Sequence, residues 1–334
     1  MAIDRQVFAH RQGWWLWRVN LLAMLLWPIS LLFCGLASLR RFGYQRGWFA
    51  SRQLPRPVLV VGNLSLGGSG KTPLVVAIAQ LVRAKGYKVG VLCRGYKSRL
   101  DDRAMVLESG QQDPAAGDEA NLLAALSGCP VGVGIDRVRA GECLLERHPD
   151  LDLVISDDGL QHYALVRDFE ILVKRDAAYG NGWCLPAGPL REPRGRAAAC
   201  DLEIDRDGRQ VSQHLGQCWN LADPTEVRRL ESFRGDKVFA LAGIGFPQGF
   251  FQALQARGLD VIGNAFPDHH AFSEAEVAAF DQRPLLVTHK DAVKLAAFAR
   301  SNIWVVPLEL HLADDLQYRI MQLLESKLNG QAPT

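Results

Sequence analysis

The chain has 334 residues, of which 48% are hydrophobic and 22% charged, a composition that excludes a disordered chain and suffices for two folded domains. With 38 basic and 36 acidic side chains the net charge is only +2, so no overall field attracts nucleic acid and an anionic partner must bind at a local cluster. The seven cysteines are scattered without a C-x-x-C pair, which argues against a disulfide framework or a zinc site and predicts a reducing, cytosol-facing location.

The N-terminal region, residues 1–50, contains an uncharged segment from Val19 to Leu39, and about 20 apolar residues suffice for a helix to cross a bilayer. Arginines flank both ends of this segment, whereas a single span usually has its basic excess on one side. Pro28 can break or kink a helix here, and the nearby tryptophans suit the depth of lipid headgroups. The sequence therefore favours a monotopic anchor in the inner leaflet, with a true span or a buried core helix as alternatives.

Short apolar runs alternate with helical patterns along the rest of the chain, which predicts a mostly parallel sheet with helices on both faces. One series lies within residues 51–205 and a second within 236–334, while residues 206–235 are polar and poorly patterned. We therefore expect an α/β core, a linker and a smaller C-terminal α/β domain over these ranges. Ser273 and Glu276 have the spacing of a helix capping box.

A glycine-rich turn lies between an apolar run from Val58 and a helical pattern from Pro73, which is the context of a phosphate-binding P-loop. Backbone N–H groups of this turn can approach phosphate oxygens, at Gly67, Gly68, Ser69 and Gly70. Lys71 is predicted to reach the outer phosphates of ATP, and Thr72 to bind Mg²⁺. Ser65 stands where the usual pattern has its first glycine, and a turn without a ligand is the alternative.

A second apolar run, from Leu151, ends in Asp157 and Asp158, at the strand end where open α/β sheets bind ligands. Two adjacent carboxylates repel each other, and Mg²⁺ would relieve this repulsion. Consecutive strand residues point to opposite faces, so the spacing leaves open which aspartate is nearer the metal. An Asp-Asp-Gly turn without metal is the alternative.

The class of P-loop protein follows from two further features of the sequence. The guanine-reading N-K-x-D motif is absent, and Leu66 stands where ParA-like ATPases have a signature lysine. An ATP-dependent kinase is therefore the leading prediction. The rivals are a membrane-associated ATPase that uses hydrolysis as a conformational switch, and a nucleotide-gated membrane-binding protein that senses ATP without turnover.

Six motifs then follow in order between about residues 58 and 272, and with the apolar N-terminus they resemble the tetraacyldisaccharide 4'-kinase (LpxK) family of lipid A biosynthesis. They read VGNLSLGGSGKTPL, CRGYKS, GDEA, DDGLQH, LPAGPLREP and FPDHHAF. The resemblance implies a P-loop domain and a smaller domain that close over ATP and Mg²⁺. It also implies phosphorylation of the 4'-hydroxyl of an acylated glucosamine disaccharide phosphate, at the cytoplasmic face of the inner membrane.

The resemblance further implies that Asp118 is the catalytic base and that His269 orients it, with His270 as the neighbouring alternative. From spacing alone, Asp118 would instead be a helix N-cap. Candidate groups for the substrate and its phosphate lie in the matched motifs, at Arg94, Gln161, His162 and Arg191, and a further candidate is Arg137. Arg191 could instead neutralise the transferring phosphoryl group, since a guanidinium binds two oxygens at once. For each side chain alone, a solvated surface group is the alternative.

Overall fold

The computed structural model describes residues 18–66, 70–95, 98, 100, 103–174, 179–206, 210–244, 247–267, 270–280 and 282–328. The chain divides into two compact units, which are described separately below. The first unit comprises Met1–Ser212 with Leu312–Thr334, and the second comprises Gln213–His311.

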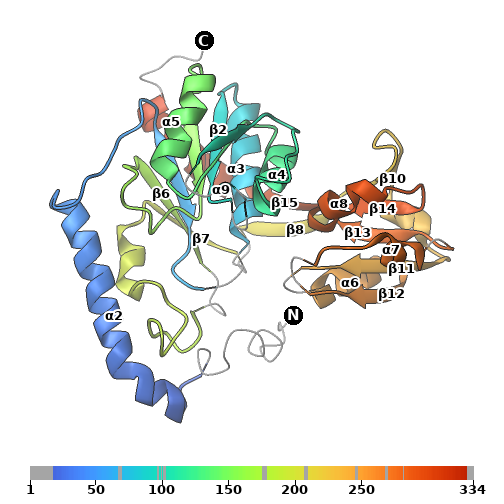
Figure 1. Ribbon diagram of the computed structural model, residues 1–334, viewed down its shortest axis with the longest axis horizontal. Helices are drawn as coiled ribbons and strands as arrows, with labels where there is room; N and C mark the ends of the chain where they lie inside the picture. Colours follow the sequence, from blue (N-terminus) through green and yellow to red (C-terminus); the bar gives the residue numbers. More distant parts are fainter. Residues whose placement is uncertain are drawn as a thin grey trace. The chain divides into compact units, whose positions relative to one another are not determined.

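The first unit is built on a seven-stranded sheet with the order β3-β4-β2-β5-β1-β6-β7, in which only β3 is antiparallel to its neighbour. Figure 1 labels strands β2, β6 and β7 of this sheet and the helices α3, α4, α5 and α9 of the same unit. The strands are β1 (Val58–Gly62), β2 (Val89–Cys93), β3 (Met105–Leu107), β4 (Val131–Val133), β5 (Leu153–Asp157), β6 (Phe169–Lys174) and β7 (Leu202–Asp205). The helices are α2 (Leu21–Gln45), α3 (Lys71–Ala84), α4 (Asp118–Ser127), α5 (Arg137–Arg147), the 3-10 helix η3 (Arg194–Ala199) and α9 (Asp314–Leu328).

The chain order explains why helices cover both faces of this sheet. The connection from β1 to β2 through α3 crosses the sheet in one direction, and the connection from β4 to β5 through α5 crosses it in the other. Right-handed crossovers in opposite directions place their helices on opposite faces. Every residue of β1, β2 and β5 is buried, as expected for central strands of a covered parallel sheet. The predicted fold class is confirmed.

The central pair of strands brings the two predicted phosphate-site motifs together. β1 and β5 are parallel neighbours, with Val61 opposite Asp157. Their carboxyl ends therefore meet at one edge of the sheet, where the P-loop follows β1 and Asp158 follows β5. This edge is the place at which doubly wound sheets bind ligands.

Helix α2 is continuous from Leu21 to Gln45, with Pro28 inside it and Asn20 as its N-cap. The helix is not broken at Pro28, so of the two effects expected of this proline a break is excluded. By length and composition α2 could cross a membrane, although such a helix near the N-terminus is weak evidence by itself. Most of its large apolar side chains are exposed, Leu25 at 67% and Leu32 at 65% among them. An exposed apolar surface of this kind is typical of contact with lipid or another protein.

The side of α2 that faces the first unit makes specific contacts. Ser30 Oγ donates a hydrogen bond of 2.5 Å to the carbonyl of Cys184, and the rings of Trp27 and Trp183 lie 6.2 Å apart. Near the end of the helix, Arg40 Nη1 donates to the carbonyl oxygen of Gln161 at 3.1 Å. Helix α2 is thus attached to loops of the first unit at two places.

The second unit has a six-stranded sheet with the order β10-β9-β14-β13-β11-β12, parallel from β14 to β12. Its elements are β9 (Cys218–Asn220), β10 (Val227–Arg228), η4 (Leu230–Phe233), β11 (Lys237–Ala242), α6 (Pro247–Ala256), β12 (Asp260–Ala265), α7 (Glu274–Ala278), β13 (Leu285–Thr288), α8 (His289–Leu295), η5 (Ala296–Phe298) and β14 (Ile303–Val306). Ser273 and Glu276 form the predicted capping box at the start of α7.

The expected linker and domain ends differ from the observed units. Residues 206–235 contain short strands, because β9 and β10 join the second sheet as an antiparallel edge. The chain enters the second unit in β8 (Val211–Leu215) and leaves it in β15 (Leu308–Leu312), and these two strands pair. Helix α9 returns to the first unit, where Lys327 Nζ lies 2.6 Å from Asp168 Oδ1.

Candidate active site

The P-loop leads from β1 into the first turn of α3. Gly70 is the N-cap of α3 and has a φ of 74°, a left-handed conformation that glycine adopts without steric cost. The N-terminus of α3 therefore presents backbone N–H groups and the positive end of the helix dipole. Gly67, Gly68 and Ser69 lie outside the described residues, so their predicted phosphate contacts stay a prediction.

Lys71 is held at the sheet edge by two partners. Its Nζ donates to Asn63 Oδ1 at 3.1 Å and lies 3.4 Å from Asp158 Oδ1. Asn63 directly follows β1 and is buried. The sequence analysis did not single out Asn63, although a polar residue between a buried strand and a P-loop is a signal that could have found it.

The two aspartates after β5 have different surroundings. Thr72 Oγ1 donates to Asp157 Oδ2 at 2.8 Å, whereas Asp157 Oδ1 is buried and has no hydrogen-bond partner among the described residues. Burial, followed by the charge of Glu119, raises the pKa of Asp157 to about 7. A buried carboxylate with an unused oxygen beside a threonine hydroxyl fits the oxygen ligands that Mg²⁺ prefers.

Asp158 is already paired with cations. It has a positive φ of 50°, and its oxygens lie 3.2 and 3.1 Å from Arg191 Nη1. Burial favours a higher pKa for Asp158, but the charges of Lys71 and Arg191 outweigh it and lower the pKa. Asp158 therefore holds two cations at the edge of the sheet, while Asp157 has the free oxygen.

Arg191 is positioned by the backbone of its own loop. Its N–H donates to the carbonyl of Leu64 at 2.7 Å, and the N–H of Leu66 donates to the carbonyl of Pro189 at 2.8 Å. The loop before Arg191 thus pairs with the P-loop itself. Gln161 connects the two, because its Oε1 accepts from Arg191 at 3.4 Å and its Nε2 donates to the carbonyl of Asn63 at 3.2 Å.

Asp118 is the first residue of α4, and the N-cap position belongs to Gly117, with a φ of 84°. Asp118 is therefore placed one residue beyond the N-cap expected from spacing alone. The next residue, Glu119, contributes to the raised pKa values of Asp157 and of the buried Cys93, so its charge acts at the same edge. Sequence reasoning singled out Asp118 and missed Glu119, although both belong to the GDEA motif.

The predicted substrate groups have unequal surroundings. Arg137 is 3% exposed, and its guanidinium donates to the carbonyls of Gly134 at 2.9 Å and Asp157 at 3.2 Å. Burial lowers the pKa of His162 to about 4, which makes its imidazole neutral at physiological pH. Arg94 directly follows β2 and is exposed. Contact of these groups with substrate stays a prediction.

The two predicted dyad histidines lie in the second unit. His269 is outside the described residues. Nε2 of His270 lies 3.1 Å from Glu276 Oε1, and its ring packs against Phe266 and Phe272, with centroids 4.8 and 5.0 Å away. His270 is therefore bound within its own unit, by the glutamate of the capping box.

Comparison with known proteins identifies the family. The model of the LpxK family, tetraacyldisaccharide-1-P 4'-kinase, matches residues 22–325. The chain is 44% identical over 323 residues to the tetraacyldisaccharide 4'-kinase of Azoarcus sp. (strain BH72), which covers 93% of this chain and 94% of the relative. It is likewise 44% identical over 347 residues to that of Chromobacterium violaceum, with 98% and 99% covered.

Among solved structures, the chain is similar to LpxK from Aquifex aeolicus in complex with ATP, with a TM-score of 0.78 and 28% sequence identity. This match covers 91% of the present chain and all of that one. The P-loop and Asp-Asp edge described above is therefore set in a fold shared with an ATP-bound relative. The resemblance predicted from the motifs is confirmed, and the chain belongs to the LpxK family of tetraacyldisaccharide-1-P 4'-kinases.

Proposed function

We propose that this protein transfers the γ-phosphoryl group of ATP to the 4'-hydroxyl of a tetraacyldisaccharide 1-phosphate, in the biosynthesis of lipid A. One observation supports the proposal most directly. Lys71, Thr72, Asp157, Asp158 and Arg191 converge on the edge formed by β1 and β5, in a chain whose relatives are named for this reaction.

The two cations would bind the phosphates of ATP. Lys71 and Arg191 share the single carboxylate of Asp158, so an incoming triphosphate can compete for both. A phosphoryl group in transfer carries spread negative charge, and fixed cations that meet this charge supply most of the catalysis. Arg191 would act there rather than on the substrate's existing phosphate.

Thr72 and Asp157 would hold Mg²⁺, with Glu119 close enough to act on the same carboxylate. Mg²⁺ held by these residues would supply positive charge against the negative charge of the ATP phosphates. The unpartnered Oδ1 of Asp157 favours this residue over Asp158 as the metal ligand. The raised pKa of Asp157 fits a carboxylate whose natural partner is a cation.

Proton transfer and substrate binding are assigned by family resemblance. Asp118 would accept the proton of the 4'-hydroxyl as the oxygen attacks, and His269 would orient it. Arg94, Arg137, Gln161 and His162 remain the candidates for the sugar and its 1-phosphate. Of these, Gln161 has the strongest support, because its side chain already contacts Arg191.

Helix α2 would hold the enzyme at the cytoplasmic face of the inner membrane, where an acylated substrate resides. Its exposed apolar side chains suit the lipid phase, and Arg40, Arg41 and Arg46 follow at its C-terminal end. Basic residues at that position can contact anionic headgroups.

The test is incubation of the full-length protein with ATP, Mg²⁺ and tetraacyldisaccharide 1-phosphate in lipid vesicles, followed by mass analysis. We expect one added phosphate, located by fragmentation on the distal sugar. ATP consumption without phosphorylated lipid would support the conformational ATPase instead. Tight ATP binding without phosphate release, with lipid present, would support the nucleotide sensor.

A further inference from the structure

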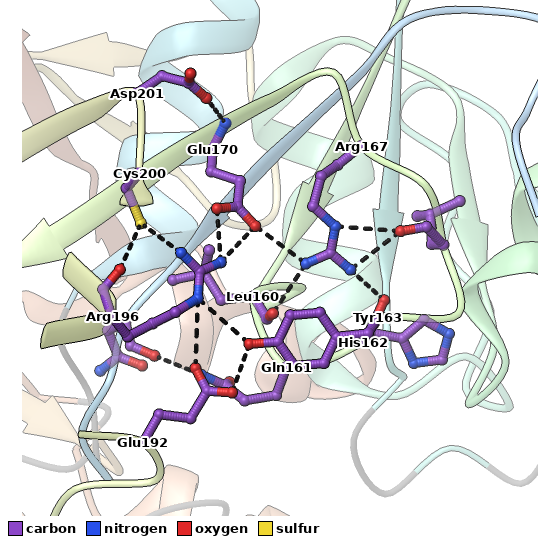
Figure 2. Close-up of polar contacts among 12 residues, drawn as sticks. Leu160, Gln161, His162, Tyr163, Arg167, Glu170, Glu192, Arg196, Cys200 and Asp201 are labelled. Atoms are coloured by element: carbon purple, nitrogen blue, oxygen red, sulfur yellow. Dashed lines mark hydrogen bonds and ion pairs between the residues drawn. The ribbon is translucent and has the colours of Figure 1, made fainter. Parts of the chain in front are cut away.

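A buried polar network lies behind the loop that carries Arg191. It consists of Tyr163, Arg167, Glu170, Glu192 and Arg196, and Figure 2 shows how these side chains point toward one another. Glu192 and Arg196 are only 4% and 3% exposed, and Glu170 is 9% exposed. Buried charges are costly unless they are paired and hydrogen-bonded, and here two arginines meet two glutamates.

The centre of the network is Arg196, in the 3-10 helix η3. Its Nη2 donates to both carboxylate oxygens of Glu170, at 2.5 and 2.6 Å, and its Nε donates to the hydroxyl of Tyr163 at 3.3 Å. The same Nε lies 3.6 Å from Glu192 Oε2. Burial favours a lower pKa for Arg196, but its hydrogen bonds and charge pairing with Glu170 raise the pKa.

Tyr163 joins this centre to the active-site loops. Its hydroxyl donates to Glu192 Oε1 at 2.6 Å. Burial and the adjacent Glu192 raise the pKa of Tyr163 to about 12, so the phenol keeps its proton at physiological pH and remains a donor. This hydrogen bond links two segments that are 29 residues apart in the sequence.

Arg167 holds the first of these segments through its backbone carbonyls. Its guanidinium donates to the backbone carbonyls of Leu160 at 2.9 Å, His162 at 2.5 Å and Leu165 at 3.0 Å. Its charge is balanced by Glu170 Oε1, at 3.2 Å. The loop that contains Gln161 is thus bound to the same buried carboxylate that Arg196 binds.

The network residues Glu192 and Tyr163 are close in sequence to the active-site residues Arg191 and Gln161. Glu192 directly follows Arg191, and Tyr163 comes two residues after Gln161. Arg191 and Gln161 contact each other at 3.4 Å, and Arg191 binds Asp158. The Tyr163–Glu192 hydrogen bond is therefore a second link between the two segments, beside the contact of Gln161 with Arg191.

Stability alone is a poor explanation for this arrangement. A buried set of charged side chains is often no more stabilising than apolar side chains of the same volume. Its hydrogen bonds are directional, however, so the charged set holds its members in one geometry. Catalysis by a fixed cation depends on geometry, since a displacement of about 1 Å can cost about 100-fold in rate. The network is placed to supply such precision to Arg191.

We propose that Tyr163 and Glu192 are positioning residues for phosphoryl transfer, which hold the Arg191 guanidinium against Asp158 through the hydrogen bond between them. This inference rests on the proposed kinase function. Neither residue is assigned a contact with ATP or the lipid, and their effect passes through Arg191.

The primary test is Tyr163→Phe, which removes the hydroxyl and keeps the ring. We expect kcat to fall by about 10- to 100-fold, while the KM for ATP changes by less than about 3-fold, because the lost interaction serves the transition state. Tyr179→Phe is the matched control: this tyrosine is half-buried, its hydroxyl oxygen is buried and has no hydrogen-bond partner among the described residues, and kcat should stay at the wild-type value.

A double-mutant cycle separates positioning from a general structural role. In an Arg191→Lys background, Tyr163→Phe should lower kcat by less than about 3-fold, because the group that it positions is gone. An equal loss in both backgrounds, an unchanged kcat in the single variant, or an increase in KM alone would overturn the proposal.

If Tyr163→Phe does not fold, Glu192→Leu carries the same expectations, because the apolar side chain removes the acceptor of the Tyr163 hydroxyl. The wild-type protein in the same assay distinguishes failure of the proposed kinase function from failure of the positioning role. Absence of transfer by the wild type contradicts the proposed function, whereas transfer by the wild type with the wrong variant pattern contradicts the positioning role only.

Discussion

The strand ends of the two units carry the same three residue types, a lysine, a threonine and an aspartate. The two clusters differ in how many of their polar atoms have hydrogen-bond partners. In the first unit these residues are Lys71 and Thr72, after β1, and Asp157, the last residue of β5. In the second unit they are Thr288, the last residue of β13, with Asp291 and Lys294 in the following helix α8. Composition does not distinguish the two clusters, so the comparison depends on how their polar atoms are satisfied.

The cluster in the second unit is closed. Asp291 is fully buried, and its Oδ2 accepts from the N–H of Gly243 at 3.1 Å and from Thr288 Oγ1 at 2.7 Å. Its Oδ1 accepts from Lys294 Nζ at 3.1 Å. Both carboxylate oxygens are therefore used, and the bonds join α8 to the loop after β11.

The cluster in the first unit is open. One oxygen of Asp157 has no partner among the described residues, and Lys71 and Arg191 divide one carboxylate between them. The comparison teaches that a polar cluster completed by the protein stabilises it, whereas a cluster with unused oxygens and shared cations is prepared for a ligand. Four predictions test this distinction.

The largest effect is expected for Lys71→Ala. Transfer should fall roughly 1000-fold, since a fixed charge at the transferring group is lost, while the melting temperature changes little. Lys294→Ala is the matched lysine variant in the closed cluster. Its main effect should be a lower melting temperature rather than a lower kcat. Unchanged transfer in Lys71→Ala would remove the P-loop from the mechanism.

Asp291→Ala should cost about 3 kcal/mol of unfolding free energy, because removal of one partner leaves Lys294 buried without its charge partner. Urea unfolding followed by circular dichroism measures this loss. A variant as stable as the wild type would show that the closed cluster does not support its unit.

Asp157→Asn should be more stable than the wild type without Mg²⁺, by on the order of 4 kcal/mol above pH 7. The pKa of Asp157 is raised from 3.8 to about 7, so ionisation of this carboxyl destabilises the folded state. That penalty is absent below about pH 4, grows as the pH rises to 7 and is constant above it.

The measurement is the melting temperature of both proteins from pH 4 to 8. The difference in melting temperature between variant and wild type should increase as the pH rises. Added Mg²⁺ should stabilise the wild type more than the variant. A constant difference across this range would contradict the raised pKa of Asp157.

The smallest effect is expected for Thr288→Val, which removes the N-cap of α8 and one bond to Asp291. The loss should be about 1 kcal/mol of stability, read by thermal unfolding, with kcat unchanged. Thr72→Val, the matched change in the open cluster, should instead lower kcat. A lower kcat in Thr288→Val and a lower stability in Thr72→Val would contradict the distinction between the two clusters.

The parts of the fold that sequence could predict are those set by local chemistry. The apolar run of β1, the glycine turn and Lys71 lie within one short segment, and the Ser273–Glu276 capping box is defined by a spacing of three residues. The short strands β9 and β10 have little apolar pattern of their own and exist because they pair with β14 and with each other. Long-range pairing of this kind leaves no local signal.

The same limit applies to the site. Lys71, Thr72 and the aspartate pair follow from motifs, and their convergence follows from the parallel pairing of β1 and β5. The contact of Tyr163 with Glu192 depends on two irregular loops, and no periodicity relates them. Which aspartate has the free oxygen likewise depends on the neighbours Thr72 and Arg191, not on the sequence of the strand.

The end of helix α2 has a consequence for work with shortened forms of this enzyme. Arg40 donates to the carbonyl of Gln161 and lies over the ring of Tyr163, 5.8 Å from its centroid. A protein that begins after Gln45 would lose these contacts together with the proposed membrane anchor. Slow turnover by such a truncated protein would then report a loosened catalytic loop as well as poor access to the substrate.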